Sequence, residues 1–133
     1  NQILCNLVLP EMIERNDGAI IIISSIAAIK GSPILGAYNI SKAADVMIVK
    51  NIATEFGHKN IRANSIAPGL IRTDFAKALW ENPDILESVL STTPMRRIGE
   101  PDEISGVAVM LASDAGNYIN GQTIVVDGGT TIS

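Results

Sequence analysis

Tyr38 and Lys42 are the residues of this sequence whose types and spacing most clearly suggest chemistry. They stand four positions apart in a segment with helical periodicity, so their side chains lie on one helix face, within reach of each other. A free tyrosine, with a pKa of about 10, is a poor base at neutral pH. An ammonium about 4 Å away, at an effective dielectric of about 20, contributes about 4 kcal/mol, or about three pKa units. Such a shift would bring the phenol into the working range of a general acid or base.

Ser25 adds a neutral hydroxyl group to this pair. It follows the apolar run 19–23, and as a hydrogen-bond donor it can hold the oxygen of a carbonyl compound or alcohol while Tyr38 gives or takes a proton. Taken alone, a tyrosine and a lysine at this spacing are equally compatible with a solvated pair on a helix surface. Whether the three residues form a catalytic site or a solvated surface pair with a separate serine depends on the elements that position their side chains.

The sequence around these residues predicts alternating helices and strands. The continuous apolar run 19–23 is typical of a central parallel strand covered on both faces. We expect helices over 1–15, 38–56 and 100–113, strands ending near 25, 68 and 129, and short helical stretches over 74–80 and 83–90. Gly57 is expected to end the long helix with a positive φ. Strands that alternate with helices predict a parallel sheet with right-handed crossovers.

Three features coincide with the predicted carboxyl ends of strands, where ligands bind in open parallel sheets. Ser24 and Ser25 close the first strand, Pro68 and Gly69 close the second, and Tyr38 begins the helix that connects them. We therefore expect one site at this edge. An ordinary turn at the strand end is the alternative interpretation of Pro68 and Gly69.

Composition and charge exclude several classes of function. The net charge of −4 and the scattered basic residues argue against a nucleic acid as partner. The longest apolar run, 19–23, is far shorter than the roughly twenty residues of a membrane-spanning helix, so no membrane partner is expected. Cys5 is expected to be a small core residue and His58 a surface residue, with no metal site. A single cysteine favours a cytoplasmic location.

Two features of the helices bear on domain organisation and assembly. The first helix starts without a capping residue, so we expect residues 1–133 to be part of a larger domain. The long helix carries two apolar stripes, of which one can cover the sheet and the other predicts a subunit interface. A neighbouring helix of the same chain is the alternative cover. The stripes are Ala44, Met47, Ile48 and Ile52, and Val46, Val49, Ala53 and Phe56.

Several motifs occur together in one order: Ser25, then YNISK at 38–42, NSIAPGLIRTDF at 64–75, and the segment from RRIGEPDE to VVDGG at 96–129. With these motifs the sequence resembles the short-chain dehydrogenase/reductase family over essentially its whole length. The resemblance implies an α/β fold, a Rossmann-like doubly wound parallel sheet. Residues 1–133 would form the C-terminal part of a single domain, with its N-terminal part absent. It also implies NAD or NADP as cofactor, and hydride exchange between the nicotinamide and a ketone or secondary alcohol.

The resemblance also implies roles for individual residues. Tyr38 would be the catalytic acid or base, Ser25 would orient the reacting oxygen, and Lys42 would lower the pKa of Tyr38 and bind the nicotinamide ribose. The predicted catalytic residues are thus Ser25, Tyr38 and Lys42, and no metal is involved. The predicted cofactor-binding residues are Tyr38, Lys42, Pro68, Gly69, Ile71 and Thr73. A small carbonyl or alcohol substrate and a homodimer or homotetramer are the expected partners.

Two departures from the family pattern limit these expectations. The phosphate-binding loop, the residue that selects NAD or NADP and the catalytic asparagine would all lie before residue 1, and Asn1 and Asn6 fall at other places on the helix. Residues 1–133 could not hold a whole dinucleotide, so we expect either that the natural protein is longer or that this chain is inactive. A 3-oxoacyl-[acyl-carrier-protein] reductase is one alternative function, although Lys77, Arg96 and Arg97 offer only a thin basic patch for such a carrier. A catalytically silent binding module is another.

Two further residues have open interpretations. Asp45, three positions after Lys42, either pairs with it or faces water. Trp80, with Phe75, Leu79 and Leu86, either shapes an apolar substrate pocket or lid, or packs within a helix pair or a subunit contact.

Overall fold

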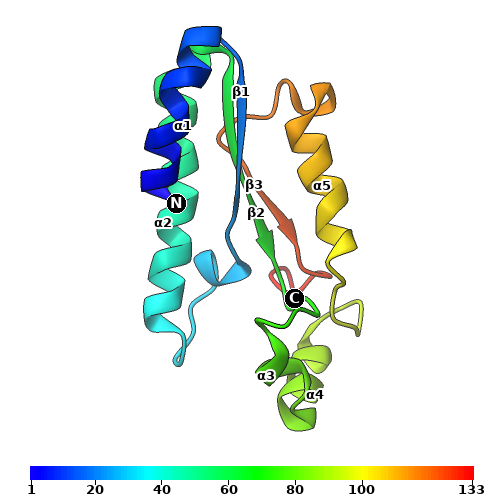
Figure 1. Cartoon of the computed structure of the whole chain (residues 1–133). Coiled ribbons are helices and arrows are strands. Elements are labelled where there is room, and N and C mark those ends of the chain that lie inside the picture. Colours follow the sequence, from blue (N-terminus) through cyan, green and yellow to red (C-terminus); the bar gives the residue numbers. More distant parts are fainter.

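The computed structural model describes all residues 1–133 and is built on a parallel sheet of three strands. The strands are β1 (Gly18–Ile23), β2 (Ile61–Pro68) and β3 (Thr123–Val126), hydrogen-bonded in the order β1-β2-β3. Ile23 lies opposite Ile66, and Pro68 lies opposite Val126, so the strands end at one common edge (Figure 1). The parallel α/β architecture predicted from the sequence is confirmed.

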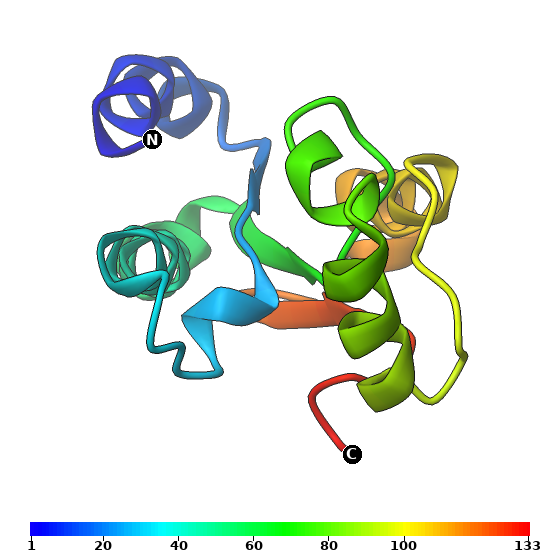
Figure 2. The same ribbon diagram turned by 90° about the horizontal axis from the view of Figure 1, so that it is seen from below.

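Helices cover both faces of this sheet. Helices α1 (Gln2–Arg15) and α2 (Gly36–Phe56) lie on one face and α5 (Asp102–Ala112) lies on the other (Figure 2). Helices α3 (Lys77–Trp80) and α4 (Pro83–Thr92) lie beyond the carboxyl ends of the strands (Figure 1). Three 3₁₀ turns, η1 (Ile26–Ala28), η2 (Gly57–Lys59) and η3 (Asp114–Gly116), complete the structure.

Within residues 1–133 the strand neighbour of β1 is β2. The central position that its isoleucine run predicts in a larger domain stays a prediction, but the predicted coverage of both its faces is seen here. The run is apolar because β1 contacts α1 and α2 on one face and α5 on the other. The apolar composition of a strand indicates that helices cover both of its faces, and it does not indicate how many strands lie beside it.

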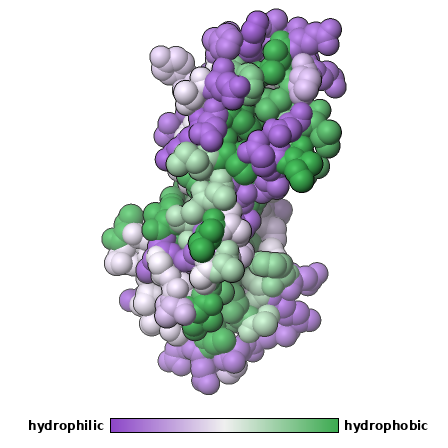
Figure 3. Space-filling view, turned by 90° about the vertical axis from the view of Figure 1, so that its left-hand side faces the viewer, coloured by the Kyte–Doolittle hydropathy of each residue, from purple (hydrophilic) through white to green (hydrophobic).

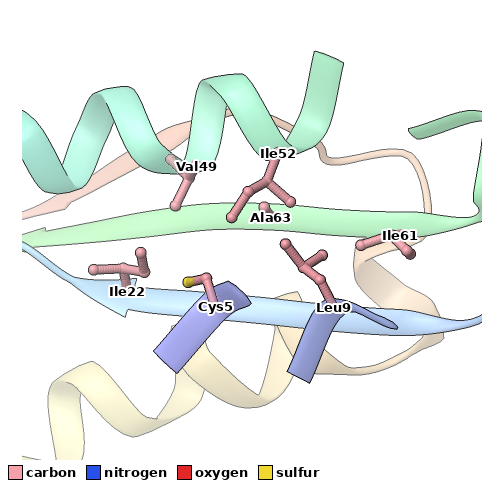
Figure 4. Close-up of a cluster of buried hydrophobic side chains, with 7 residues drawn as sticks. All are labelled: Cys5, Leu9, Ile22, Val49, Ile52, Ile61 and Ala63. Atoms are coloured by element: carbon pink, nitrogen blue, oxygen red, sulfur yellow. The ribbon is translucent and has the colours of Figure 1, made fainter. Parts of the chain in front are cut away.

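The main core cluster joins α1, α2, β1 and β2. Its members point toward one another between the helices and the sheet (Figure 4), and they are Cys5, Leu9, Ile22, Val49, Ile52, Ile61 and Ala63. Each fully buried aliphatic side chain of this kind contributes about 2 kcal/mol to stability. Cys5 is buried in this cluster, so the expectation of a small core residue is confirmed. Burial raises the pKa of its thiol.

Helix α2 buries a stripe that differs from both predicted stripes. Its buried residues are Val49 and Ile52, one from each predicted stripe, and Asp45, which belongs to neither. Ala44 and Met47 face outward. The helix ends at Phe56 as predicted, but the positive φ expected at Gly57 is not found. Gly57 has a φ of −58° and begins η2, and the left-handed residue is Asn60, with a φ of 56°. A 3₁₀ turn extends the chain before it reverses, so the positive φ falls three residues later.

Arg62 of β2 fastens α5 to the sheet. Its guanidinium donates to the carbonyl oxygens of Leu111, at 2.6 Å, and Gly116, at 3.0 Å, where α5 ends. A positive charge at a helix C-terminus offsets the partial negative charge of the last carbonyls. At Gly116 a Cβ would come 2.6 Å from the Met110 carbonyl oxygen, so only glycine permits this close approach.

Candidate active site

The carboxyl end of β1 and the first turns of α2 carry the three predicted catalytic residues. Ser24, which is buried, donates from its hydroxyl to the Lys42 carbonyl oxygen at 2.9 Å. The Ser24 backbone N–H donates to the Ile66 carbonyl oxygen, which continues the ladder between β1 and β2. Ser24 therefore fixes the turn of α2 that carries Lys42 against the end of the sheet. The sequence placed Ser24 at a strand end but did not indicate this positioning contact.

Ser25 caps η1, and η1 packs against α2. The Ser25 Oγ accepts the Ala27 backbone N–H at 3.1 Å, which is a typical capping interaction. Its own hydroxyl proton has no acceptor within the chain and is available to a ligand. The side chain is half-buried at the edge where β1 ends.

Lys42 holds its ammonium group between the end of β1 and its own helix. The Nζ donates to the Ile23 carbonyl oxygen at 3.1 Å and pairs with Asp45 Oδ2 at 3.4 Å. It lies 5.8 Å from the centre of the Tyr38 ring, so the tyrosine and the lysine do share one environment on α2. The Tyr38 hydroxyl has no partner within the chain, and its side chain is half-buried.

Asp45 resolves one of the open interpretations, because it pairs with Lys42 and does not face water. Only 7% of the residue is exposed, and its second carboxylate oxygen accepts the Asn1 side-chain amide at 2.7 Å. A buried carboxylate needs such partners to offset its lost hydration. The spacing to Lys42 had indicated the pair, whereas the contact with α1 depends on tertiary packing alone.

Four of the predicted cofactor-binding residues lie at the end of β2 and in the loop after it, namely Pro68, Gly69, Ile71 and Thr73. The Gly69 N–H donates to the Val126 carbonyl oxygen at 3.0 Å, and Ile71 forms a parallel bridge with Gly99. At Gly69 a Cβ would lie 2.9 Å from the Cα of Asp127, so the loop passes too close to β3 for any other residue. Pro68, Gly69, Ile71 and Thr73 therefore lie at the same sheet edge as Ser25, Tyr38 and Lys42.

Other residues take no visible part in this site. His58 lies exposed in η2, as expected, and no group of three or more His, Cys, Asp or Glu side chains has the arrangement of a metal site. A small cavity of about 90 Å³ lies beneath the 70–71 and 126–128 segments, lined in part by Thr93 and Thr130. The two threonine hydroxyls bond each other at 3.0 Å, so its polar lining is already satisfied. None of the helices combines the length and the apolar character that a membrane-spanning segment requires.

Comparisons with known proteins show which proteins this chain resembles. The family model described as enoyl-(acyl carrier protein) reductase matches residues 2–131. Dehydrogenase/reductase SDR family member 4 of Bos taurus is 47% identical over 128 residues, which cover 96% of this chain and 46% of that protein. The chain thus spans about half the length of the curated relatives it matches.

Solved structures agree with the sequence comparison. A gluconate 5-dehydrogenase from Burkholderia cenocepacia, in complex with NADP and tartrate, is 35% identical with a TM-score of 0.95, covering 97% of this chain and 51% of that one. A 7α-hydroxysteroid dehydrogenase complexed with NADH and 7-oxo glycochenodeoxycholic acid is 42% identical with a TM-score of 0.90, covering 95% and 49%. Both similarities span nearly all the elements described above.

Proposed function

The chain belongs to the short-chain dehydrogenase/reductase family, and on that premise we propose that the whole protein is an NAD- or NADP-dependent oxidoreductase acting on a ketone or secondary alcohol. The observation that carries the proposal is the position of Ser25, Tyr38 and Lys42 around the end of β1, fixed by the bond from Ser24 to the Lys42 carbonyl oxygen. The relatives solved with NADP or NADH support a nicotinamide cofactor.

The residues at this edge fit the nicotinamide end of such a cofactor. Lys42 uses two of its three N–H groups on Ile23 and Asp45, which leaves one for a ribose hydroxyl. The Thr73 Oγ accepts the Ala76 N–H and keeps its proton to donate to a carboxamide or phosphate. Pro68, Gly69 and Ile71 would line the ring. When bound, the nicotinamide supplies or accepts the hydride.

The catalytic residues would act on the oxygen of the substrate. Ser25 donates its free hydroxyl proton in a hydrogen bond to that oxygen and orients it, while Tyr38 gives the oxygen a proton in reduction or removes one in oxidation. Lys42 supplies a positive charge beside the Tyr38 ring, which favours the transient negative charge on the phenol oxygen.

Replacement of Tyr38 tests this mechanism. In the whole protein, assayed on a panel of ketones and secondary alcohols, Tyr38→Phe should lower kcat by about a hundredfold or more, because it removes the positioned proton donor. Tyr118→Phe is the matched control, since Tyr118 is fully exposed in the turn after α5 and should keep full activity. Retention of most turnover by Tyr38→Phe would contradict the proposed role.

A second candidate is the reduction of a 3-oxoacyl thioester on an acyl carrier protein. The description of the matching family model, which names an acyl carrier protein, favours it. The charges do not favour it, because the three basic residues of the predicted patch already have partners. Lys77 pairs with Glu81, Arg97 pairs with Glu103, and Arg96 donates to carbonyl oxygens of α4. The ratio of rates on acyl thioesters and on simple ketones separates the two candidates.

A catalytically silent binding module and self-association complete the proposals. Cofactor binding without turnover on any substrate would identify the module.

Assembly into a dimer or tetramer is proposed through the outward face of α2, where Ile40 and Met47 are exposed on one side of the helix. The cytoplasmic location stays a prediction.

A further inference from the structure

The side chain of Trp80 is turned toward the loop that carries the predicted cofactor-binding residues. Its indole Nε1 donates to the Thr73 carbonyl oxygen at 2.9 Å, and the residue is only partly exposed. The same carbonyl oxygen accepts the Ala76 backbone N–H at 3.1 Å. Two donors occupy the two lone pairs of this oxygen, so the peptide plane between Thr73 and Asp74 has one preferred orientation.

A second contact of Trp80 reaches the neighbouring residue of the loop. The Arg72 guanidinium lies 5.3 Å from the centre of the indole ring, within the range of a cation–π interaction. The Arg72 Nε also pairs with Glu100 Oε1 at 3.0 Å, and the Arg72 N–H donates to the Gly99 carbonyl oxygen. The indole therefore packs on the Arg72 side chain, which is in turn bound by Glu100, in the segment that leads into α5.

These contacts make Trp80 the main side-chain link between α3 and the loop 69–76. No other side chain of α3 or α4 donates a hydrogen bond into this loop. Both helices lie beyond the edge of the sheet where Ser25, Tyr38 and Lys42 are placed (Figures 1 and 2). The Trp80 bond thus adds a direct link from α3 to the Thr73 peptide, besides the backbone bonds that join the first turn of α3 to the loop.

We propose that Trp80 is a positioning residue for the cofactor, whose indole N–H holds the Thr73 peptide in the orientation that lets the Thr73 side chain bind the nicotinamide end. This inference rests on the proposed function of the same edge. It assigns Trp80 to the cofactor loop, whereas a lining residue of the substrate pocket would act on substrate affinity.

The decisive variant removes the N–H and keeps an aromatic ring. In the whole protein, Trp80→Phe should raise the cofactor Kd about fivefold, the effect expected of one lost hydrogen bond, with kcat at saturating cofactor changed less than twofold. The KM for the carbonyl substrate, at saturating cofactor, should stay within twofold. Tyr118→Phe is the control for an aromatic substitution far from the loop, and should leave all three values unchanged.

A second replacement guards against misfolding. Benzothienyl-alanine at position 80 keeps the bicyclic shape but has sulfur where the indole has its N–H, and it should reproduce the weaker cofactor binding with an unchanged Tm. Cofactor titration should also change the tryptophan fluorescence of the native protein. The part of this change that comes from Trp80 should be absent when Trp80→Phe is titrated. An unchanged cofactor Kd in both variants, or a rise confined to the substrate KM, would overturn the inference. Failure of the native protein to bind either nicotinamide cofactor would instead overturn the proposed function.

Discussion

Lys42 and Asp45 form the most buried ion pair of the molecule. Their side chains are 22% and 10% exposed, whereas the other ion pairs join side chains that are about 40% exposed or more. Exposed pairs contribute little, because water screens them and the side chains lose freedom. The Asp45 carboxylate has two partners, Lys42 on the same helix and Asn1, the N-cap residue of α1, so it supports both the predicted site and the packing of α1 on α2.

Loss of the Asp45 carboxylate should therefore lower stability. Asp45→Ala removes the charged partner of the Lys42 ammonium, which keeps only the Ile23 carbonyl oxygen, and leaves the Asn1 side-chain amide without its acceptor. We expect a loss of about 1–3 kcal/mol in the free energy of unfolding. Urea denaturation of the whole protein measures it. Glu55→Ala, which removes an exposed and unpaired carboxylate from the same helix, is the control. Equal stability of the two variants would show that the pair contributes nothing.

At the scale of elements, the start of α5 is organised around one carboxylate. Glu103 accepts two hydrogen bonds from the Arg97 guanidinium, at 2.6 and 2.7 Å, and one from the Glu100 backbone N–H at 2.8 Å. The last of these satisfies a free N–H at the helix N-terminus, as in a capping box. The bond from Arg97, followed by the bond from the Glu100 N–H, lowers the pKa of Glu103 from its usual 4.5 to about 2.

This depressed pKa predicts how the stability of α5 depends on pH. The charged form of Glu103 is favoured in the folded state, so its contribution is fully present above about pH 4.5 and is lost as the pH falls toward about 2. The Tm difference between the native protein and Glu103→Gln should be present at pH 6 and should vanish near pH 2. Glu87→Gln, at an exposed position of α4 without an ion pair, is the control. A difference that is constant over this pH range would contradict the assignment.

At the scale of the whole molecule, apolar side chains remain exposed on the side formed by α1 and α2. Figure 3 shows this side, where hydrophobic residues are interspersed with hydrophilic ones. Ile3, Leu4 and Leu7 of α1 and Met47 of α2 are each more than half exposed. Apolar exposure of this extent on neighbouring helices is typical of a surface that another chain or segment covers.

Self-association through α2 can be tested at this surface. If α2 forms the interface, Met47→Glu in the whole protein should shift the mass measured by light scattering toward the monomer, because a buried unpaired charge is costly. The circular dichroism spectrum should stay native. Val109→Glu, at a similarly exposed apolar position on α5, is the control and should keep the native mass. Dissociation by Val109→Glu and not by Met47→Glu would place the interface on the opposite side.

Much of the fold and the central part of the site could be predicted because they depend on local patterns. The isoleucine run, the turn at Asn16 and the apolar periodicity of α2 determine elements whose bounds follow from backbone geometry. The four-residue spacing of Tyr38 and Lys42 places both on one helix face in any helix that contains them. Their presence at the carboxyl edge of a parallel sheet follows from the order of strands and helices along the chain.

The remaining features depend on contacts between segments that are distant in the sequence, which no local pattern records. The partner of the Ser24 hydroxyl lies 18 residues away, and that of the Asp45 carboxylate on α1 lies 44 residues away. The mixed buried stripe of α2 likewise depends on how the helices pack over the sheet. The sequence by itself thus determined which groups stand at the sheet edge, and tertiary packing decided which of them touch, because hydrogen bonds and burial depend on distances through space.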